Sequence, residues 1–374
     1  MSELFESTSI AGMNLPNRFI RSATWEGLAA PDGAVTARLI DRMVELARGG
    51  VGLIISSHTY ISQEGQATPW QLGVYKDELV PGLKELTTEV HANGGKIILQ
   101  LAHAGIYAEK SLSGQPPLTV SDIEGSAGAE GREITRNGIK RLIKSYTTAA
   151  RRALEAGFDG IQIHSAHGYL LSQFMSPVFN KRRDEYGGSI TNRVRIHLEI
   201  YRSVRKTVGE QFPILIKMNC GDFVDNGLDI KESVQAAKLM AAAGFNAIEL
   251  SGGFIKTGKL SPSRPGINSQ DKEAYFQKYG REIKNEITIP LILVGGIRSF
   301  EIAEKIIQEG TADYISMSRP FIREPDLINR WQSGDREKAK CISDNLCFNP
   351  GFAGKGIYCV TEEREAERKN SKLS

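Results

Sequence analysis

The sequence predicts a (β/α)8 barrel, in which eight parallel strands alternate with helices and close into a ring. Eight short apolar runs alternate with longer amphipathic segments along the chain of 374 residues. The longer segments repeat their apolar residues at helical spacing, and several end in a glycine that suits a helix C-terminus. This regular alternation favours a barrel of ordinary length over a doubly wound sheet.

The predicted strands follow one another at intervals that leave room for a helix between them. In chain order they are NRFIRSA (17–23), VGLIISS (51–57), KIILQLA (96–102), DGIQIHS (159–165), PILIKMN (213–219), AIELSGG (247–253), PLILVGG (290–296) and DYISMSR (313–319). Between them lie segments with helical spacing, such as SVQAAKLMAAAG (233–244) and FEIAEKIIQEG (300–310). No linker divides the chain, so we expect one domain over residues 1–374.

Two segments break the regular spacing. Residues 103–138, after the third strand, are rich in Gly, Ser and Pro. A loop of this length in a compact domain is usually functional, so we expect a lid over the C-terminal mouth of the barrel. Residues 360–374 are strongly charged, and we expect a flexible tail there.

Composition excludes several classes of partner. The formal net charge is +3 and the basic residues are scattered, which argues against nucleic acid. The apolar runs are far shorter than the roughly 20 residues that span a bilayer, so no membrane partner is expected. Four cysteines are too few for a disulfide scaffold, and the first residues lack a signal-peptide layout. We therefore expect a cytoplasmic protein with a small-molecule substrate; homo-oligomer formation is left open.

The segment HSAHGYL places His164, His167 and Tyr169 directly after an apolar strand, at the mouth where barrels of this type carry their reacting groups. A structural role for the histidines is one alternative. A zinc site is another, although two histidines three positions apart lack the Glu of a His-Glu-x-x-His motif and a third ligand. In the interpretation we prefer, two imidazoles bind a carbonyl oxygen that gains negative charge, and the tyrosine protonates a carbanion-like carbon.

The last two predicted strands indicate a phosphate site. Gly295 and Gly296 let the backbone approach a ligand, and Ser299 is placed to cap the next helix. Ser318 and Arg319 end the eighth strand, and the loops after strands seven and eight form the usual phosphate site of this fold.

Two polar residues end earlier strands and suit a flavin. Lys217 adds a cation at the end of the fifth strand, and Gln100 supplies both a donor and an acceptor at the end of the third. Neither residue is specific by itself, but both are consistent with a flavin bound at the mouth of the barrel.

These residues together resemble the old yellow enzyme family of FMN-dependent NADH:flavin oxidoreductases. The resemblance runs through NLPNRFIRSA, GVGLIIS, ILQLAHAG, GFDGIQIHSAHGYLLSQFMSPVFNKRRDEYGGSITNRVR, LVGGI and SRPFIREPDL. It implies an ene-reductase that takes hydride from NADH or NADPH onto FMN and then reduces the activated C=C bond of an α,β-unsaturated carbonyl compound. The physiological substrate and the preferred nicotinamide stay open.

The resemblance also implies roles for individual residues. His164 and His167 bind the carbonyl oxygen and Tyr169 donates the proton, with Tyr107 in the predicted lid as the next candidate donor. The residues implied to contact FMN are Ala23, Thr24, Trp25, His58, Gln100, Lys217, Gly253, Gly295, Gly296, Ser318 and Arg319. No metal is implied.

This chain departs from the family pattern at several of these positions. Trp25 stands where relatives carry Thr or Cys beside the flavin, and Ser318 replaces a common Gly. His58 stands where relatives usually have a small residue, and a structural and a functional role for it are both open.

The cysteines near the C-terminus form another departure. Larger relatives carry four cysteines here for a [4Fe–4S] cluster. This chain has Cys341, Cys347 and Cys359, with Asp344 where another cysteine is expected. We interpret the three as remnants, and a cluster with an unusual ligand is the alternative.

Three other functions compete with ene reduction. An amine dehydrogenase or demethylase shares the cofactor, and a non-catalytic flavin-binding electron-transfer protein would not need the His-His-Tyr trio. A flavin-free barrel lyase would use the phosphate site for its substrate instead.

Overall fold

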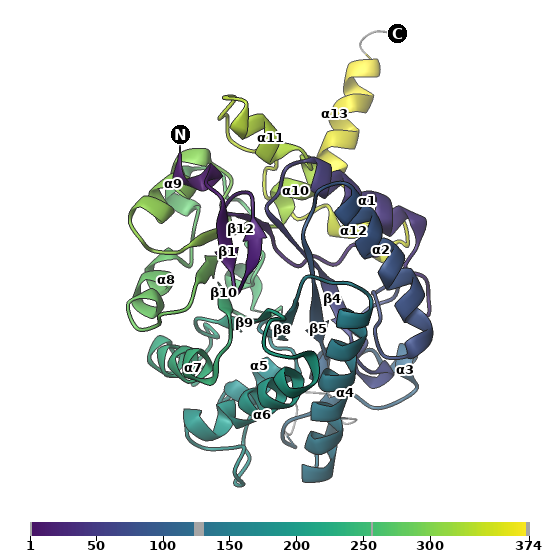
Figure 1. The fold of residues 1–374 in the computed structure, drawn as a ribbon, viewed down its shortest axis with the longest axis vertical. Helices are drawn as coiled ribbons and strands as arrows, with labels where there is room; N and C mark the ends of the chain where they lie inside the picture. The colour runs from purple at the N-terminus through teal and green to yellow at the C-terminus, as the bar shows by residue number, and fades with distance from the viewer. Residues whose placement is uncertain (1, 123–130, 256, 372–374) are drawn as a thin grey trace.

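Eight parallel strands close into a barrel at the centre of the molecule, as the sequence predicts (Figure 1). The computed structural model describes residues 2–122, 131–255 and 257–371. Each predicted run contributes one strand: β3 (Phe19–Arg21), β4 (Leu53–Tyr60), β5 (Ile97–Ala102), β8 (Ile161–Ser165), β9 (Ile214–Asn219), β10 (Ala247–Ser251), β11 (Leu291–Leu293) and β12 (Tyr314–Met317). Spatial order follows chain order, and β12 pairs with β3 to close the ring.

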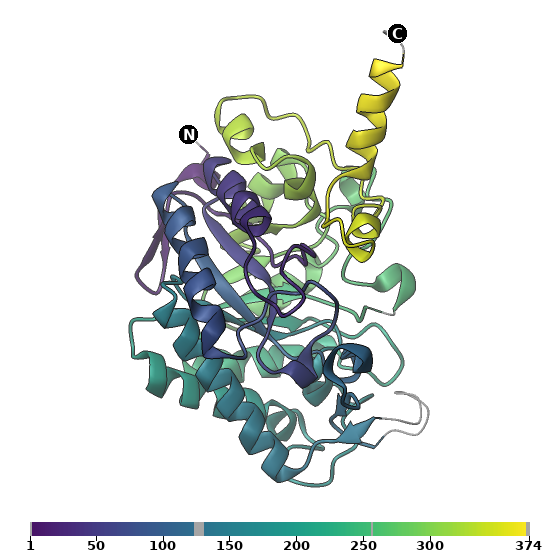
Figure 2. The same cartoon turned by 90° about the vertical axis from the view of Figure 1, so that its right-hand side faces the viewer.

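Helices surround the barrel and connect its strands along the chain (Figures 1 and 2). They are α1 (Ala37–Arg48), α2 (Val80–Ala92), α4 (Arg136–Glu155), α6 (Ile190–Val208), α7 (Ile230–Ala243), α8 (Gln277–Lys284), α9 (Phe300–Gln308), α10 (Arg319–Arg323) and α11 (Leu327–Gln332). The side chains of Thr36, Thr135, Ser189 and Asp229 accept a backbone N–H in the first turns of α1, α4, α6 and α7. These caps satisfy donors that a helix start leaves unpaired.

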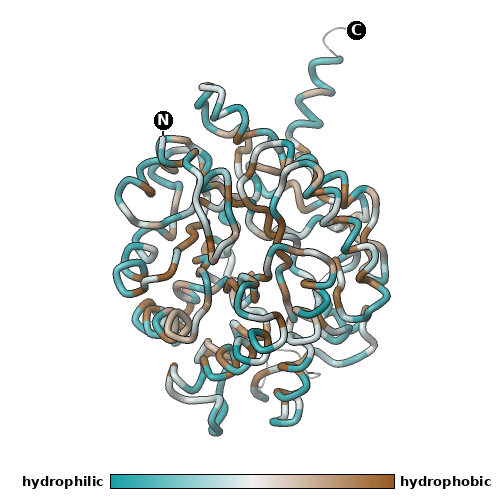
Figure 3. The backbone as a smooth tube through the Cα atoms, in the orientation of Figure 1, coloured by the Kyte–Doolittle hydropathy of each residue, from teal (hydrophilic) through white to brown (hydrophobic). Residues whose placement is uncertain are grey.

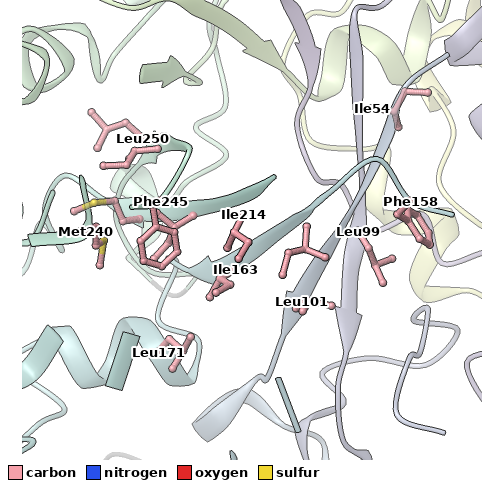
Figure 4. Packing of buried hydrophobic residues seen from close by; sticks show 14 of the residues in the cluster. Ile54, Leu99, Leu101, Phe158, Ile163, Leu171, Ile214, Met240, Phe245 and Leu250 are labelled. Atoms are coloured by element: carbon pink, nitrogen blue, oxygen red, sulfur yellow. The ribbon is translucent and has the colours of Figure 1, made fainter. Parts of the chain in front are cut away.

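The main hydrophobic core lies between the strands and the helices. Apolar residues concentrate in the central strands, while the outer helices are largely hydrophilic on their exposed sides (Figure 3). Leu99, Leu101 and Ile163 of neighbouring strands are fully buried in this core, together with Phe158 and Leu171 from the adjoining segments (Figure 4).

A short hairpin that the sequence analysis does not predict closes the N-terminal end of the barrel. Strands β1 (Thr8–Ile10) and β2 (Met13–Leu15) pair in antiparallel fashion. Ile10 and Leu15 pack against apolar residues inside the barrel. The hydroxyl of Tyr314, at the start of β12, donates to the Ser9 carbonyl at 3.1 Å. The barrel is therefore sealed with apolar side chains at this end, and polar chemistry is confined to the other.

The predicted lid contains short elements. Between β5 and α4 lie a 3-10 turn (Gly105–Tyr107), α3 (Lys110–Ser113), and the paired strands β6 (Leu118–Thr119) and β7 (Arg132–Glu133). Residues 123–130 of the predicted lid lie outside the described part. Helix α4 begins at Arg136, two residues before the end of the predicted lid.

The C-terminal region contains two helices. Helix α12 (Phe348–Phe352) follows the cysteine segment, and α13 (Val360–Asn370) occupies most of the expected flexible tail and projects away from the barrel (Figure 2). Acidic residues in its first turn and basic residues in its last complement the helix dipole. Across the described residues, no helix combines the length and the apolar character that a membrane span requires.

Candidate active site

A cavity of about 500 Å³ opens where the barrel strands end. Residues at or after the C-terminal ends of β3, β4, β8, β9, β10, β11 and β12 line it, as expected for this fold. The predicted site residues that line it are Ala23, Thr24, Trp25, His58, His167, Tyr169, Lys217, Gly296, Ser318 and Arg319. The other predicted residues, His164, Gln100, Gly253 and Gly295, are not among the lining residues.

His164, His167 and Tyr169 bring their rings together beside this cavity, which His167 and Tyr169 line. His164 lies in β8, His167 in the turn that follows, and Tyr169 immediately before α5 (Leu170–Met175). The ring centroid of His164 lies 4.8 Å from that of Tyr169 and 5.1 Å from that of His167. Nδ1 of His164 is buried without a hydrogen-bond partner among the described residues. Such a nitrogen is costly to bury unless a ligand pairs with it.

His167 is held in a strained backbone conformation. Its φ angle is +65°, in the left-handed region that non-glycine residues rarely adopt. Its backbone N–H donates to Oδ1 of Asn219 at 3.1 Å, and its Nε2 lies 2.8 Å from the hydroxyl of Ser251. Asn219 is held in turn, because its Nδ2 donates to Asp222 and to the Gly253 carbonyl, each at 3.2 Å. Strain of this kind persists only where surrounding contacts enforce it.

Burial fixes the protonation of the three rings. It lowers the pKa values of His164 and His167 well below 6.5, and the nearby charge of Lys217 lowers them further. Burial also raises the pKa of Tyr169 far above 10, with a smaller effect from Tyr107. At neutral pH the site therefore presents two uncharged imidazoles and a protonated phenol. This set can donate hydrogen bonds to an oxygen and a proton to a neighbouring atom.

His58 completes the aromatic wall. The pairing of β4 with β5 shifts register between Ile55 and His58. His58 lines the cavity, and its ring centroid lies 5.5 Å from that of Tyr169. Its Nε2 is buried and unpartnered among the described residues, and burial lowers its pKa to about 4. His58 therefore lies at the cavity, and its role stays a prediction.

A chain of buried polar side chains runs beneath the cavity. Gln100 donates through Nε2 to Gln162 at 2.6 Å, and Gln162 donates to Glu249 at 2.9 Å. Glu249 accepts from Ser22 at 2.7 Å and pairs with Lys217 at 3.2 Å. Gln100 is therefore hydrogen-bonded to a neighbouring amide and is not among the lining residues, and its contact with a cofactor stays a prediction. The sequence places it at a strand end but does not show how deep in the barrel its amide lies.

Two of the predicted glycines shape the wall from behind. Gly253 has φ of +76°, and a Cβ there would meet the Leu260 carbonyl oxygen at 2.3 Å. Gly295 has φ of +135°, and with Gly296 it accommodates the ring of Tyr275, which a Cβ at Gly296 would meet at 2.6 Å. These positions require glycine because of backbone conformation and close packing.

The predicted phosphate end is polar and cationic. Arg319 lines the cavity and donates to the carbonyl of Arg264 at 2.9 Å and to Oδ1 of Asn345 at 2.7 Å. Ser318 and Thr24 share a hydrogen bond of 2.7 Å. This arrangement leaves a guanidinium and two hydroxyls at one end of the cavity.

Ser299 does not cap α9 with its own side chain, contrary to the expectation. Its hydroxyl instead donates to Glu273 at 2.6 Å, and that carboxylate also accepts the backbone N–H groups of Ser299 and Arg298. A buried carboxylate from outside the loop therefore holds the backbone just before this helix. The sequence could not show this, because Glu273 is distant along the chain.

The C-terminal segment forms part of the cavity wall. Ser343, Asn345, Phe348 and Phe352 line the cavity. Trp25 packs against this segment, with its ring centroid 4.9 Å from that of Phe352.

The three cysteines of that segment lie around a small cavity of their own with Asp344. One carboxylate oxygen of Asp344 accepts from Thr361 and the other from the backbone of Leu346. Burial raises the pKa of Cys347 to about 12, so its thiol is protonated. Among the described residues, no three His, Cys, Asp or Glu side chains are arranged to hold a metal ion. The interpretation of the three cysteines as remnants of a cluster site stays a prediction.

Several residues of the site are absent from the sequence prediction. Asn219 and Ser251 end barrel strands, and the strand-end rule that indicates His164 would also have indicated them. Glu249 is a carboxylate within an apolar strand, which is a detectable signal. No local signal identifies Ser343 or Asn345, because only the folding of the C-terminal segment brings them to the cavity.

Comparison with known proteins gives a family, relatives and a matching fold. The model of the NADH:flavin oxidoreductase / NADH oxidase family matches residues 3–338. NADH oxidase from Thermoanaerobacter brockii is 39% identical over an alignment of 387 residues. The alignment covers 98% of this chain and 58% of that protein. The chain thus spans less than two thirds of that relative. 4,4'-Dithiodibutanoate disulfide reductase from Rhodococcus erythropolis is 31% identical, with 98% and 97% covered. The solved structure of an old yellow enzyme homologue from Zymomonas mobilis matches with a TM-score of 0.76 and 30% identity, over 90% and 94% of the two chains.

Proposed function

The chain belongs to the NADH:flavin oxidoreductase / NADH oxidase family, and we propose that it reduces the activated C=C bond of α,β-unsaturated carbonyl compounds. The predicted resemblance to old yellow enzyme is confirmed by the family match and by the Zymomonas mobilis homologue. The protein is an oxidoreductase that uses FMN, with NADH or NADPH as reductant. The substrate and the roles of individual residues are proposals that rest on the geometry of the cavity.

The cavity suits FMN in size and in charge. Its volume of about 500 Å³ lies in the usual range for cofactor sites. Its charged lining side chains in the described part are Lys217, Arg298 and Arg319, all cationic, and no described lining residue is Asp or Glu. When bound, FMN accepts hydride from NAD(P)H and passes it to an acceptor, and its ring carries an additional negative charge in between.

We propose that the two ends of the cavity hold different parts of FMN. The residues assigned to the phosphate are Gly295, Gly296, Ser318 and Arg319, and those assigned to the ring system are Ala23, Thr24, Trp25, His58 and Lys217. Arg319 presents a guanidinium, which suits a phosphate group. The unpartnered Nε2 of His58 lies at the ring end of this assignment.

The histidine pair would bind the carbonyl oxygen of the substrate. His164 has an unpartnered Nδ1 among the described residues, and in His167 the Ser251 hydroxyl would donate to Nε2 at 2.8 Å, which leaves Nδ1–H to donate. Neutral imidazoles can each donate one hydrogen bond to the same oxygen. Because the oxygen gains charge as the C=C bond accepts hydride, both hydrogen bonds strengthen in the transition state.

Tyr169 would deliver the proton that completes the reduction. Its ring contacts that of His164, so its hydroxyl belongs to the same wall as the oxygen-binding pair. Its raised pKa keeps the proton in place at neutral pH until a carbanion-like carbon develops next to it.

The observation that carries this proposal is the convergence of two neutral imidazoles and a protonated phenol at a cavity with cationic lining. An amine dehydrogenase would bind a substrate that carries positive charge, which Lys217 and Arg319 disfavour. A simple electron-transfer protein would not need the trio. These contacts therefore support an oxygen that becomes anionic.

The experiment is anaerobic oxidation of NADH and NADPH with and without 2-cyclohexenone, with cyclohexanone measured as product. We expect enone-dependent oxidation that the His164→Ala/His167→Ala variant loses and that His91→Ala, at the surface, retains. NAD(P)H oxidation without product would contradict ene reduction. Turnover of 4,4'-dithiodibutanoate alone would instead favour the activity named for the Rhodococcus relative.

A further inference from the structure

A buried carboxylate contacts three residues that line the cavity, Ser22, Lys217 and Ser316, which we call the cavity floor. Glu249, in β10, is fully buried and does not line the cavity. Its Oε1 accepts from the hydroxyls of Ser22 and Ser316 at 2.7 and 2.8 Å and lies 3.2 Å from Nζ of Lys217. Its Oε2 accepts from Gln162 at 2.9 Å. One carboxylate therefore joins two hydroxyls and one ammonium group of the cavity lining.

Glu249 is ionised at neutral pH despite its burial. Burial alone would raise its pKa, but the charge of Lys217 and the hydrogen bonds from Ser22, Gln162 and Ser316 hold the pKa below the ordinary value. Taking a charge pair out of water costs free energy that its mutual attraction often fails to recover. Buried pairs can frequently be replaced by neutral groups without loss of stability, so stability alone does not explain this one.

The pair determines what Lys217 presents to the cavity. Nζ of Lys217 donates to the hydroxyl of Ser22 at 2.8 Å, and that hydroxyl donates to Glu249. The ammonium group is thus held at the floor from two directions. Its positive charge is offset by a negative charge 3.2 Å away in an environment closed to water, where charges interact more strongly than in solution.

We propose that Glu249 is a positioning residue that holds Lys217 at the cavity floor and, by offsetting its charge, lowers the reduction potential of bound FMN. A cation at the floor stabilises the negative charge that reduction places on the ring, and a neighbouring carboxylate opposes that stabilisation. The inference rests on the proposed place of the FMN ring beside Lys217. It does not depend on the substrate.

The test is the midpoint potential of the FMN-loaded protein, measured by anaerobic spectral titration against reference dyes. Glu249→Gln keeps the shape and removes the charge. We expect its two-electron equilibrium to shift toward the reduced form by at least tenfold, which corresponds to about 30 mV. Glu249→Asp keeps the charge and should stay within threefold of the parent. Glu324→Gln removes another buried carboxylate, which pairs with Arg330 and not with Lys217, and should also leave the potential within threefold.

Each other result would overturn the proposal in a recognisable way. An unchanged potential in Glu249→Gln would mean that the carboxylate does not act on the cofactor. A Glu249→Gln protein that fails to fold or to hold FMN, while Glu249→Asp succeeds, would assign the carboxylate to the structure of the barrel alone. If the parent protein holds FMN and the Lys217→Met variant has the same midpoint potential, the proposed place of the ring beside Lys217 is wrong. That result would not contradict the pairing of Glu249 with Lys217.

Discussion

Replacing Asn219 by Ala should displace His167 without altering its imidazole. The change removes Oδ1, which accepts the His167 backbone N–H at 3.1 Å. It also removes Nδ2, which donates to Asp222 at 3.2 Å. Each buried group left unpaired costs about 1–3 kcal/mol, so the free energy of unfolding should fall by about 2–5 kcal/mol. The left-handed backbone at His167 costs about 1–3 kcal/mol and would lose its main support.

The displaced ring should bind anionic oxygens less well. Phenolates place such an oxygen between the two histidines in our account, and a charge-assisted hydrogen bond contributes about 1.5–3 kcal/mol. At about 1.4 kcal/mol for each tenfold, loss of the His167 contact should weaken p-hydroxybenzaldehyde binding by about 10- to 150-fold. Spectral titration of the FMN-loaded protein measures the affinity, and urea unfolding measures the stability.

The control variant is Ser233→Ala, which removes a buried hydrogen bond to the backbone carbonyl of Asn219 at 3.1 Å and leaves both hydrogen bonds of His167 in place. It should cost about 1 kcal/mol of stability and leave phenolate affinity unchanged. If Asn219→Ala loses stability and yet binds phenolate as tightly as the parent, Asn219 does not position His167.

Two further outcomes follow from the same geometry. Removal of both imidazoles in His164→Ala/His167→Ala should weaken phenolate binding by about 3–6 kcal/mol in the same titration, and parent-like affinity would show that the pair does not bind the oxygen. The pKa values of His58 and His197 are lowered to about 4 by burial, and those of His164 and His167 lie well below 6.5, so the unfolded chain binds more protons than the folded one below pH 6.5. Stability should therefore be full above about pH 6.5 and fall on acidification, by up to about 1.4 kcal/mol per pH unit for each histidine, and equal urea midpoints at pH 7 and pH 5 would contradict this.

The barrel could be predicted because buried parallel strands are nearly continuous apolar runs. Each quoted run overlaps one strand, and β4 extends three residues beyond its run. The hairpin of Thr8–Leu15 escapes prediction because its strands are only three residues long, and pairing of β6 with β7 depends on contacts across a loop. Helix α13 is absent from the prediction because its strong charge masks a short helix with favourable ends.

The site could be predicted in part, because the ends of barrel strands converge on one mouth. This rule places His167, Tyr169 and Lys217 at the cavity. The rule does not tell how deep in the barrel a side chain lies. Gln100 ends its predicted strand, but its amide is buried and bonded to that of Gln162. The rule also cannot predict that Asn345 and Phe348 line the cavity, because their place depends on how the C-terminal segment folds back over the barrel.

The central claim is that Tyr169 protonates a substrate whose oxygen the two histidines hold. The most direct measurement is rapid mixing of Tyr169→Phe in the two half-reactions, flavin reduction by NAD(P)H and reoxidation by 2-cyclohexenone. Phe keeps the ring beside His164 and removes only the hydroxyl. Loss of general acid catalysis typically costs about 10²- to 10⁴-fold, so reoxidation by the enone should slow by that range while reduction by NAD(P)H stays within a few-fold. Equal slowing of both half-reactions, or unchanged reoxidation, would contradict the account and direct the search for the proton donor to Tyr107.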